Sequence, residues 1–164
     1  MLKVTLAPVG QELVLVLERP VPSVDLFGYM QERGGRLPEH EAKVLLQQVL
    51  AALAELHSNG VVHRDVKTEN ILVETGSNPP HVWMNDLGCG YFPRDGPYTE
   101  FREWYVSGGY GVGQLTAWQV GVMLYVMLTG RFKTVTHNCQ DLLRSCLSNC
   151  LKARPALETL PVHP

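Results

Sequence analysis

The sequence has little charge of either sign. Asp, Glu, Lys and Arg make up 18% of the 164 residues, and 14 basic against 16 acidic side chains give a formal net charge of −2. A chain without a basic excess lacks the electrostatic footprint of a nucleic-acid or anionic-membrane binder, so we expect neither partner. The hydrophobic fraction of 45% suits one folded domain and excludes a disordered chain.

Long hydrophobic runs are also absent from the sequence. The longest apolar stretch, 120–128, is interrupted by Gly121 and Tyr125 and is too short to span a bilayer. Residues 1–10 contain no clean apolar segment that ends in a cleavage site. We therefore expect no signal peptide and no membrane-spanning helix.

Cysteine is scarce, and its spacing does not suggest a metal site. The four cysteines are Cys89, Cys139, Cys146 and Cys150, and none forms a C-x-x-C pair. Cys146 and Cys150 could share one helix face, but two thiolates with His137 as the only helper make a poor zinc site. We expect reduced, partly buried thiols of an intracellular protein.

Hydrophobic periodicity predicts a mainly α chain with small β-hairpins. The clearest helix is 38–58, where apolar residues recur at steps of three and four, and Asn59-Gly60 supplies the stop. A second long helix, 115–128, is apolar nearly all round, so we expect it to be buried and to pack on the first. Shorter helices are predicted at 24–32, at 138–151 and after Pro155.

Three strands are predicted. Residues 13–17 are a continuous aliphatic run, typical of a strand buried on both faces, and Pro20 and Pro22 end it. Residues 71–73 and 81–84 are two short strands joined by a turn rich in Gly, Ser, Asn and Pro. This pair forms a hairpin directly after the most polar segment of the chain.

That polar segment, 63–70, carries the candidate chemistry, and Asp86-Leu87-Gly88 follows sixteen residues after Asn70. Phosphoryl transfer is mainly positioning and charge neutralisation. Asp65 can accept or orient the proton of an attacking hydroxyl, and Lys67 can place a positive charge on the transferring phosphate. The Asn70 and Asp86 side chains offer the hard oxygen ligands that Mg²⁺ prefers.

The pattern His63-Arg64-Asp65-x-Lys67-x-x-Asn70 resembles the catalytic loop of eukaryotic protein kinases at every defining position. Residues 17–27 are similar to the hinge of the PIM serine/threonine kinases, and 98–101 and 139–155 also look PIM-like, of the expanded type found in fish. The resemblance covers 11–164 with gaps. It implies the fold of a protein-kinase-like C-lobe with a remnant hinge strand.

The resemblance implies a role for each matching polar residue. Asp65 would be the catalytic base, Lys67 the phosphate clamp, and Asn70 and Asp86 the metal ligands. The implied reaction transfers the γ-phosphate of ATP to a protein Ser or Thr, with ATP and Mg²⁺ as cofactors. Leu87 replaces the family's usual Phe, and we expect it to pack similarly because it is also apolar.

The resemblance also implies an ATP-binding set. Leu17 would be the gatekeeper, Glu18 would offer a hinge carbonyl to the adenine, and Leu72 would form the floor under the base. Asp25 and Glu69 would lie where PIM kinases contact the ribose or basic substrate residues. The alternative for these two carboxylates is simple solvation.

The chain departs from the family pattern in three places. Gly10 is the only glycine ahead of the hinge and no strand lysine is recognisable, so 1–23 is expected to be a remnant of the upper lobe. Glu103 resembles the end of the Ala-Pro-Glu element, but about eight residues of the activation and substrate-docking segment are missing before it. After Gly130 there is no room for helix G, so 24–164 is expected to be a shortened lower lobe.

Two functional hypotheses stay open. The first is a serine/threonine protein kinase that acts on a protein substrate in the cytoplasm or nucleus. The second is a catalytically silent pseudokinase fragment or binding module that keeps the fold. In either case Glu103 is expected to pair with Arg154. The three central polar residues are expected to converge on one cleft beside the ATP-binding set: Asp65, Asn70 and Asp86.

Overall fold

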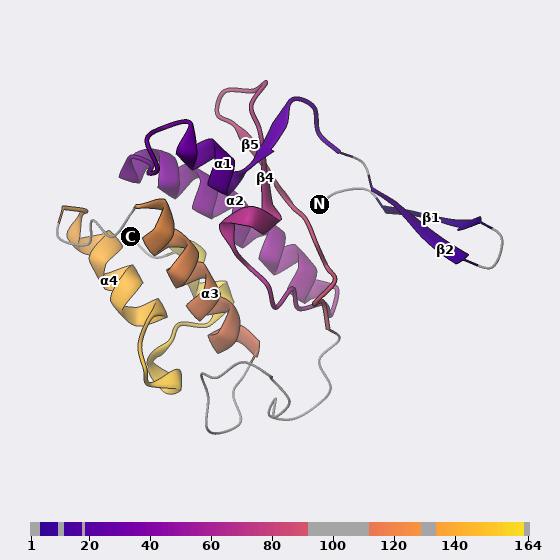
Figure 1. The fold of residues 1–164 in the computed structure, drawn as a ribbon. Helices are drawn as coiled ribbons and strands as arrows, with labels where there is room; N and C mark the ends of the chain where they lie inside the picture. The colour runs from indigo at the N-terminus through magenta and orange to yellow at the C-terminus, as the bar shows by residue number, and fades with distance from the viewer. Residues whose placement is uncertain (1–3, 10–11, 18, 92–111, 129–133, 163–164) are drawn as a thin grey trace.

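The computed structural model describes residues 4–9, 12–17, 19–91, 112–128 and 134–162, with the backbone alone over 4–17. Within these ranges, α-helices pack beside a three-stranded antiparallel sheet, and two further strands form a sheet of their own (Figure 1). No helix in the described ranges is both long and apolar enough to cross a membrane. The mainly helical composition with small β-hairpins confirms the predicted fold class.

The first sheet is a hairpin. Strand β1 (Val4–Val9) pairs antiparallel with β2 (Glu12–Leu17), so that Val4 lies opposite Leu17. Strand β2 confirms the predicted strand at 13–17, whereas β1 was not predicted. Pro8 in β1 disfavours a central strand, but both strands of a two-stranded sheet are edges, where a missing N–H is tolerated. The predicted single hinge strand is therefore a hairpin.

The helix predicted at 24–32 is shorter than expected. Residues Ser23–Asp25 form strand β3, and helix α1 covers Leu26–Gln31. The Asp25 side chain caps α1, because its Oδ1 accepts a hydrogen bond of 2.7 Å from the Gly28 N–H. Gly34 and Gly35 follow with φ of 79°, a conformation that glycine adopts without strain, and they end this segment.

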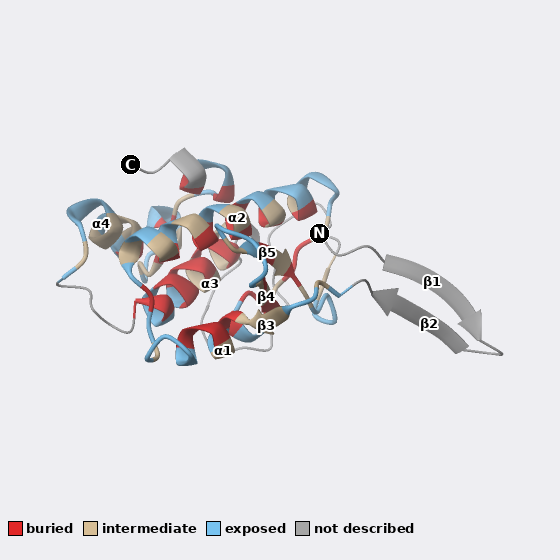
Figure 2. Cartoon of the chain, turned by 90° about the horizontal axis from the view of Figure 1, so that it is seen from above, coloured by how far each residue is buried: buried red, intermediate tan, exposed pale blue. Residues whose placement is uncertain are grey.

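Helix α2 (Glu39–Ser58) confirms the predicted long helix. Pro38 stands at its N-cap, and Gly60 follows its end with φ of 70°. Its buried side chains recur at steps of three and four and so lie on one face of the helix (Figure 2). The buried residues of α2 are Ala42, Leu45, Leu46, Val49, Leu50, Leu53 and Leu56.

The second sheet has the order β3-β4-β5, with β4 (Ile71–Glu74) and β5 (His81–Met84) as the predicted hairpin. Alternate residues of β4 and β5 are buried, and β5 packs on α2. Gln48 of α2 covers the edge of β5. Its Nε2 donates to the Pro80 carbonyl at 3.0 Å, and its Oε1 accepts from the Val82 N–H at 2.9 Å.

Helix α3 (Val112–Met127) lies beside α2 as predicted, but it is not buried all round. The side chains of Val122, Tyr125 and Val126 are 41%, 44% and 38% exposed. The opposite face is buried against α2 and α4 (His137–Cys146). Because α3 is apolar on nearly every face, its sequence alone could not predict which face would be buried.

The helix predicted at 138–151 ends five residues early. Thr136 caps α4 by accepting from the Cys139 N–H at 3.3 Å, and Leu147 terminates the helix. Two 3₁₀ helices follow, η2 (Leu151–Ala153) and η3 (Leu157–Val162), and η3 is the predicted tail after Pro155. The apolar period of α4 stops at Cys146, which is the last buried residue of that helix.

Candidate functional site

The loop that carries the candidate chemistry begins at the end of α2. Val62 and Tyr91 form an isolated antiparallel bridge, with backbone hydrogen bonds of 2.8 and 2.9 Å. This bridge joins the start of the 63–70 segment to the end of the segment that contains Asp86. This bridge therefore holds the 63–70 segment close to the segment that contains Asp86, although Asp86 lies sixteen residues after Asn70 in the sequence.

His63 is the buried centre of this loop, with 1% of its surface exposed. Its Nε2 lies 2.9 Å from the Asn85 carbonyl oxygen, and its Nδ1 accepts from the Asp65 N–H at 3.3 Å. Both contacts are satisfied by the neutral tautomer that carries its proton on Nε2. His63 thus connects the backbone of Asp65 with the residue that precedes Asp86.

Two neighbouring side chains contact the carboxylate of Asp65. Lys67 Nζ lies 2.6 Å from Asp65 Oδ2, and Asn70 Nδ2 donates to the same oxygen at 2.9 Å. Partial burial raises the pKa of Asp65, but the hydrogen bonds from Lys67 and Asn70 and the charge of Lys67 act together to hold that pKa below its usual value. The carboxylate is therefore ionised at neutral pH.

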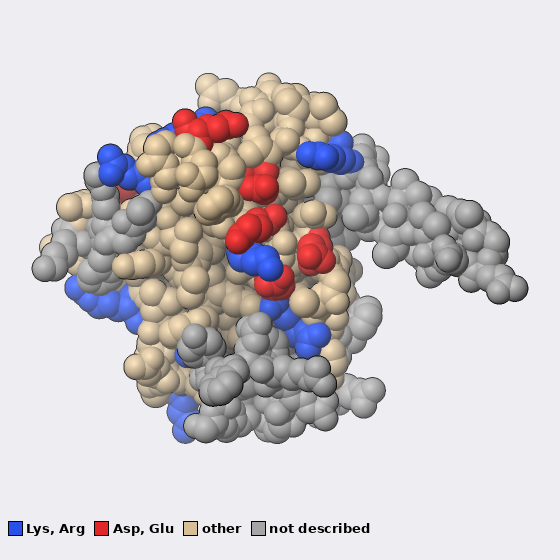
Figure 3. Space-filling model, viewed as in Figure 1, with Lys and Arg blue, Asp and Glu red and all other residues tan. Residues whose placement is uncertain are grey.

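Asp86 is brought to the same place through the backbone. The Asn85 N–H donates to the Asn70 carbonyl at 2.9 Å, so Asp86 directly follows a residue bonded to the 63–70 segment. The hydrogen bond with Asp65 is the largest cause that raises the pKa of Lys67. The negative charges of Asp65, Glu69 and Asp86 raise it further. Acidic side chains gather around a basic one over η1 (Thr68–Asn70) and β4 (Figure 3).

The backbone is strained at two positions of this site. Arg64 and Asp86 have φ of 64° and 60°, and they are the non-glycine residues with positive φ among those described. Such conformations cost free energy and persist where the surroundings enforce them. At Asp86 the Oδ1 accepts from the Gly88 N–H at 3.0 Å, which supports the turn. Both strained residues therefore lie in the two segments that the sequence analysis singled out, Arg64 in 63–70 and Asp86 in 86–88.

The oxygen atoms of the site fit Mg²⁺ as a partial ligand set. Asn70 uses its Nδ2 as the donor to Asp65, and no hydrogen bond to its Oδ1 occurs within the described residues. Asp86 is exposed, and only its Oδ1 is used in the turn. The described residues contain no group of three or more His, Cys, Asp or Glu able to hold a metal. Mg²⁺ commonly takes one or two protein oxygens and completes its shell with water and phosphate.

The predicted ATP-binding set is described only in part. Leu72 lies in β4 opposite Asp25 of β3 and next to Trp83 of β5, and it is half-buried on the face away from α2. Leu17 ends β2, where the backbone alone is described, and Glu18 lies outside the described residues. Leu72 and Asp25 are thus brought together, and the hinge contacts stay a prediction.

Glu69 and Asp25 are both accessible to a ligand to some degree. Glu69 is exposed on η1, and its Oε2 accepts from the Thr68 hydroxyl at 2.8 Å. Asp25 has a structural role as the cap of α1, which the sequence analysis missed. Capping uses Oδ1 and does not exclude a second contact through Oδ2.

Helix α3 supports the loop through a residue that the sequence analysis did not identify. Gln119 Nε2 donates to the carbonyl oxygen of Arg64, the residue with the strained backbone. The Arg64 Nε donates to the Cys89 carbonyl at 2.5 Å, and its guanidinium lies over the Tyr91 ring at 5.1 Å. Arg64 therefore links α3, the 63–70 segment and the segment after Asp86.

Three expectations about single residues have different outcomes. Leu87 is 44% exposed, so it does not pack as expected; it stands in a surface turn that a hydrogen bond from the Gly90 N–H to the Leu87 carbonyl closes. Cys89 is also exposed rather than packed. Arg154 is buried, donates to the Ser148 carbonyl at 2.9 Å and lies over the Trp118 ring. Its predicted partner Glu103 lies outside the described residues.

Comparison with known proteins assigns this arrangement to a family. Residues 4–135 match the protein kinase domain. The chain belongs to the protein kinase family. It is 36% identical to serine/threonine-protein kinase pim-2 of Danio rerio, over 94% of this chain and 57% of that protein. It is 28% identical to serine/threonine-protein kinase prk-2 of Caenorhabditis elegans, over 95% of this chain and 41% of that protein.

These relatives confirm the resemblance to the PIM kinases and the kinase-like fold class. The chain is also 34% identical to the carbon catabolite-derepressing protein kinase of Candida albicans, over 73% of this chain and 20% of that protein. The chain spans little more than half the length of pim-2 and less of the other two. The alignment with pim-2 occupies 179 positions, more than the 164 residues present here, so pim-2 carries residues that this chain lacks.

Proposed function

We propose that the protein is an ATP-dependent serine/threonine protein kinase of the PIM-like type. The observation that carries this proposal is the position of Asp65. Its carboxylate is held by Lys67 and Asn70 in a loop whose backbone is bonded to the residue before Asp86. Membership of the protein kinase family and the serine/threonine kinase relatives support the same reaction class.

Asp65 is proposed to accept or orient the proton of the substrate hydroxyl. A base for this role must be ionised at neutral pH, and the lowered pKa of Asp65 meets that requirement. The carboxylate side chain is 31% exposed, so a substrate hydroxyl can approach it. Asn70 donates to this carboxylate, and the His63 ring holds the Asp65 backbone by accepting from its N–H.

Lys67 is proposed to contact the transferring phosphate. Its side chain is 47% exposed, and its ammonium group lies against Asp65 at 2.6 Å, close to where the attacking hydroxyl must bind. A flexible lysine can keep that contact and donate a second hydrogen bond to a phosphate oxygen. It would then neutralise charge as the phosphoryl group transfers.

Asn70 and Asp86 are the residues that would hold Mg²⁺, through an amide oxygen and a carboxylate oxygen. When bound, the ion would neutralise phosphate charge and orient the phosphate chain. The protein's own contribution is the fixed turn at Asp86, which the Gly88 N–H supports. The buried amide of Asn70 contributes a second fixed oxygen because its Nδ2 is already bonded to Asp65.

The nucleotide and substrate contacts complete the proposal. Leu17 and Glu18 would contact the adenine from the hinge, and Leu72 would lie under it on β4. Asp25, opposite Leu72, would contact the ribose or a basic substrate residue. Glu69, exposed beside Lys67, would attract basic residues of a protein substrate.

A second candidate function is a binding module without turnover. The observation that favours it is compositional: within this chain Gly10 is the only glycine before Gly28. A kinase uses a glycine-rich loop to cover the phosphates and a strand lysine to fix them. Without both, the 164 residues alone are expected to bind Mg-ATP weakly and to transfer phosphate poorly. Well-oriented geometry can contribute as much as ~7–11 kcal/mol of barrier lowering.

Radiolabel transfer from ATP to a basic Ser/Thr peptide separates the two functions. The assay compares wild type with Asp65→Asn and Asp86→Asn, and Asp141→Asn on exposed α4 serves as the matched control. Transfer above background that both site variants abolish supports the kinase. Transfer at about 1–100 s⁻¹ would contradict the expectation of a weak isolated chain. Background transfer that no variant changes supports the silent module.

A further inference from the structure

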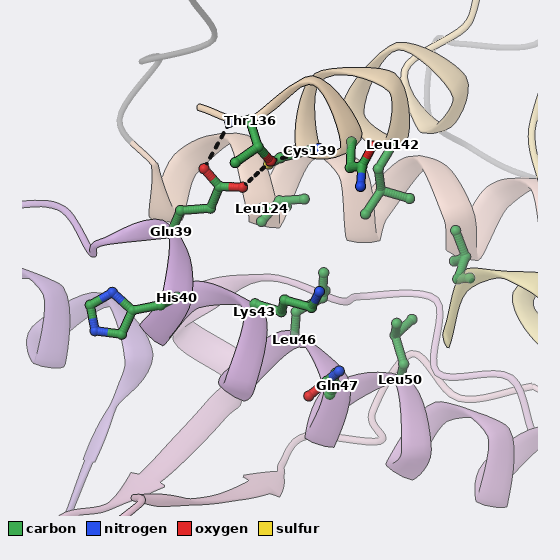
Figure 4. Close-up of a pocket in the computed structure, with 12 residues that line it drawn as sticks. Glu39, His40, Lys43, Leu46, Gln47, Leu50, Leu124, Thr136, Cys139 and Leu142 are labelled. Carbon is green, nitrogen blue, oxygen red and sulfur yellow. Dashed lines mark hydrogen bonds between the residues drawn. The ribbon is translucent and has the colours of Figure 1, made fainter. Parts of the chain in front are cut away.

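The hairpin of β1 and β2 projects away from the helices of the molecule (Figure 1). Within the described residues the two strands pair with each other, and neither packs extensively on another element. The helices, by contrast, are joined to one another: Glu39 of α2 accepts from the Thr136 N–H, ahead of α4, at 2.9 Å (Figure 4). A hairpin of two strands is at best marginally stable in water without further strands or a helix to pack on. Further pairing would therefore stabilise this hairpin.

The register of the hairpin determines which of its backbone groups point outward. Val9 and Glu12 lie opposite each other with two residues between them in the sequence, and such a closing pair is a hydrogen-bonded one. Hydrogen-bonded and non-hydrogen-bonded pairs alternate along an antiparallel ladder. Every second pair therefore turns its N–H and C=O groups away from the partner strand. These outward pairs are Pro8–Leu13, Leu6–Leu15 and Val4–Leu17.

The two outer edges of the hairpin differ in what they offer to a further strand. The edge of β1 includes Pro8, which has no N–H to donate, and a proline on an edge opposes pairing. The edge of β2 provides a backbone donor and a backbone acceptor at each of its outward positions, Leu13, Leu15 and Leu17. Glu12 is the only charged residue of β2, and it is not one of those positions. The β2 edge therefore lacks the proline and the charge that protect edge strands.

The edge of β2 is complementary to a second copy of itself. When two β2 strands run antiparallel about a two-fold axis at Leu15, that residue lies opposite its own copy, and Leu13 lies opposite Leu17. Each of these outward pairs can then exchange two hydrogen bonds, as in any antiparallel ladder. No charged residue occurs at 13–17, so like charges do not oppose each other across the axis. The contact is closed, and Pro8 remains on both outer edges of the resulting sheet.

We propose that two copies of this chain associate by pairing their β2 strands antiparallel, which forms one sheet of the order β1-β2-β2-β1. The second copy is the partner because the edge matches itself in register and carries no charge to repel its own copy. The contact is small, and small interfaces are weak, so the expected dissociation constant is on the order of 100 µM. The inference does not depend on ATP binding or on phosphoryl transfer.

Sedimentation equilibrium and amide hydrogen exchange test the proposal on the full chain. Sedimentation is expected to show a monomer that becomes a dimer as the concentration rises to about 1 mM, tenfold above the expected dissociation constant. Over the same range the amides of Leu13, Leu15 and Leu17 are expected to exchange more slowly, while those of Val4 and Leu6 on the other edge do not change. A monomer throughout, larger assemblies, or equal protection of both edges would overturn the proposal.

A matched pair of proline substitutions locates the contact on one edge. Leu15→Pro removes the outward N–H at the proposed two-fold axis and leaves the hydrogen bonds within the hairpin in place. Leu6→Pro makes the same change at the residue directly opposite, on the edge of β1. Leu15→Pro is expected to weaken the dimer about tenfold or more, because the change occurs in both copies, whereas Leu6→Pro is expected to stay within about twofold of wild type. Equal effects of the two substitutions would contradict pairing through β2.

A charge at the same position is the second test, since a proline can also disturb the hairpin itself. Leu15→Lys keeps every backbone N–H and places two lysines opposite each other across the axis. It is expected to weaken the dimer about tenfold at low salt and less at high salt, because salt screens the repulsion. Leu6→Lys, on the edge of β1, is expected to leave the dimer unchanged. Dimerisation of Leu15→Lys as tight as that of wild type would overturn the proposal.

Discussion

The side-chain amide of Asn70 holds Asp65 at two points. Its Nδ2 donates to the Asp65 backbone carbonyl and to the Asp65 Oδ2, each at 2.9 Å. Asn70 is 6% exposed, so this contact is made away from competing water. One residue thus fixes both the backbone and the carboxylate of the proposed base, while its own Oδ1 accepts no hydrogen bond within the described residues.

Replacing Asn70 with alanine is expected to destabilise the fold. The change removes two hydrogen bonds and leaves the part-buried Asp65 carbonyl without its partner, a cost of about 1–3 kcal/mol. Urea denaturation measures the free energy of unfolding, with the exposed Asn149→Ala as the matched control. Equal stabilities for the two variants would show that the Asn70 contact contributes nothing to the loop.

Removing the charge of Lys67 is expected to raise the pKa of Asp65. Burial favours a higher pKa for Asp65, and the Lys67 contact is a main reason that it lies below the usual value. Lys67→Met should therefore move the titration of the Asp65 carboxyl, followed by NMR, to higher pH. Lys152→Met, with its side chain in solvent, should leave it in place.

The same shift has a consequence for acid stability. Because the pKa of Asp65 is lower in the folded state than in the unfolded state, its ionised form stabilises the fold above about pH 4. That stability is lost as pH falls through the folded pKa. Wild type should lose more stability than Lys67→Met on acidification below pH 4, and identical losses would contradict the assignment.

His57 is expected to make the fold sensitive to mild acid. Burial lowers its pKa, against an opposing effect of Glu158, and its Nε2 is buried with no hydrogen-bond partner among the described residues. Because the folded pKa is lowered, protonation favours the unfolded state, and stability is lost as pH falls below about 6.5. Unfolding free energies at pH 7.5 and pH 5 measure this loss.

A substitution separates His57 from other sources of acid sensitivity. His57→Leu removes the unpaired nitrogen and is expected to stabilise the fold by on the order of 1 kcal/mol and to reduce the loss between pH 7.5 and pH 5. His137→Leu, at an exposed position on α4, should leave the loss unchanged. An unaltered pH dependence in His57→Leu would show that another group is responsible.

Gln48 is expected to stabilise the sheet whose strand β5 leads into the turn at Asp86. Its amide satisfies the Pro80 carbonyl and the Val82 N–H on the outer edge of β5. Gln48→Ala should cost about 1–3 kcal/mol, because both edge groups lose a part-buried partner. Gln47→Ala changes an exposed neighbour and should stay within about 0.5 kcal/mol of wild type.

The sequence predicted those parts of the fold that local patterns decide. Helix α2 has a regular apolar stripe and clear end signals, and the 63–70 segment is a short motif whose geometry follows from its own residues. The hairpin of β4 and β5 was likewise predicted, because alternation and turn residues agree there. Local and tertiary preferences coincide in each of these cases.

The errors arose where tertiary contacts decide. Gln119 supports Arg64 across 55 residues of sequence, and no local pattern indicates such a contact. Asp25 was included in a helix although its side chain caps one, since the β3 pairing depends on distant β4. The exposed side of α3 and the exposed Leu87 depend on which elements cover them, which composition does not reveal.

Calorimetric titration of the chain with ATP, with and without Mg²⁺, tests most directly whether Asp65, Lys67, Asn70 and Asp86 form the phosphate end of a kinase site. The account predicts weak binding that requires Mg²⁺. Asp86→Asn should weaken it by about tenfold or more, and the exposed Asp141→Asn should not change it. Absence of binding, or binding that is the same without Mg²⁺ and in Asp86→Asn, would contradict the account.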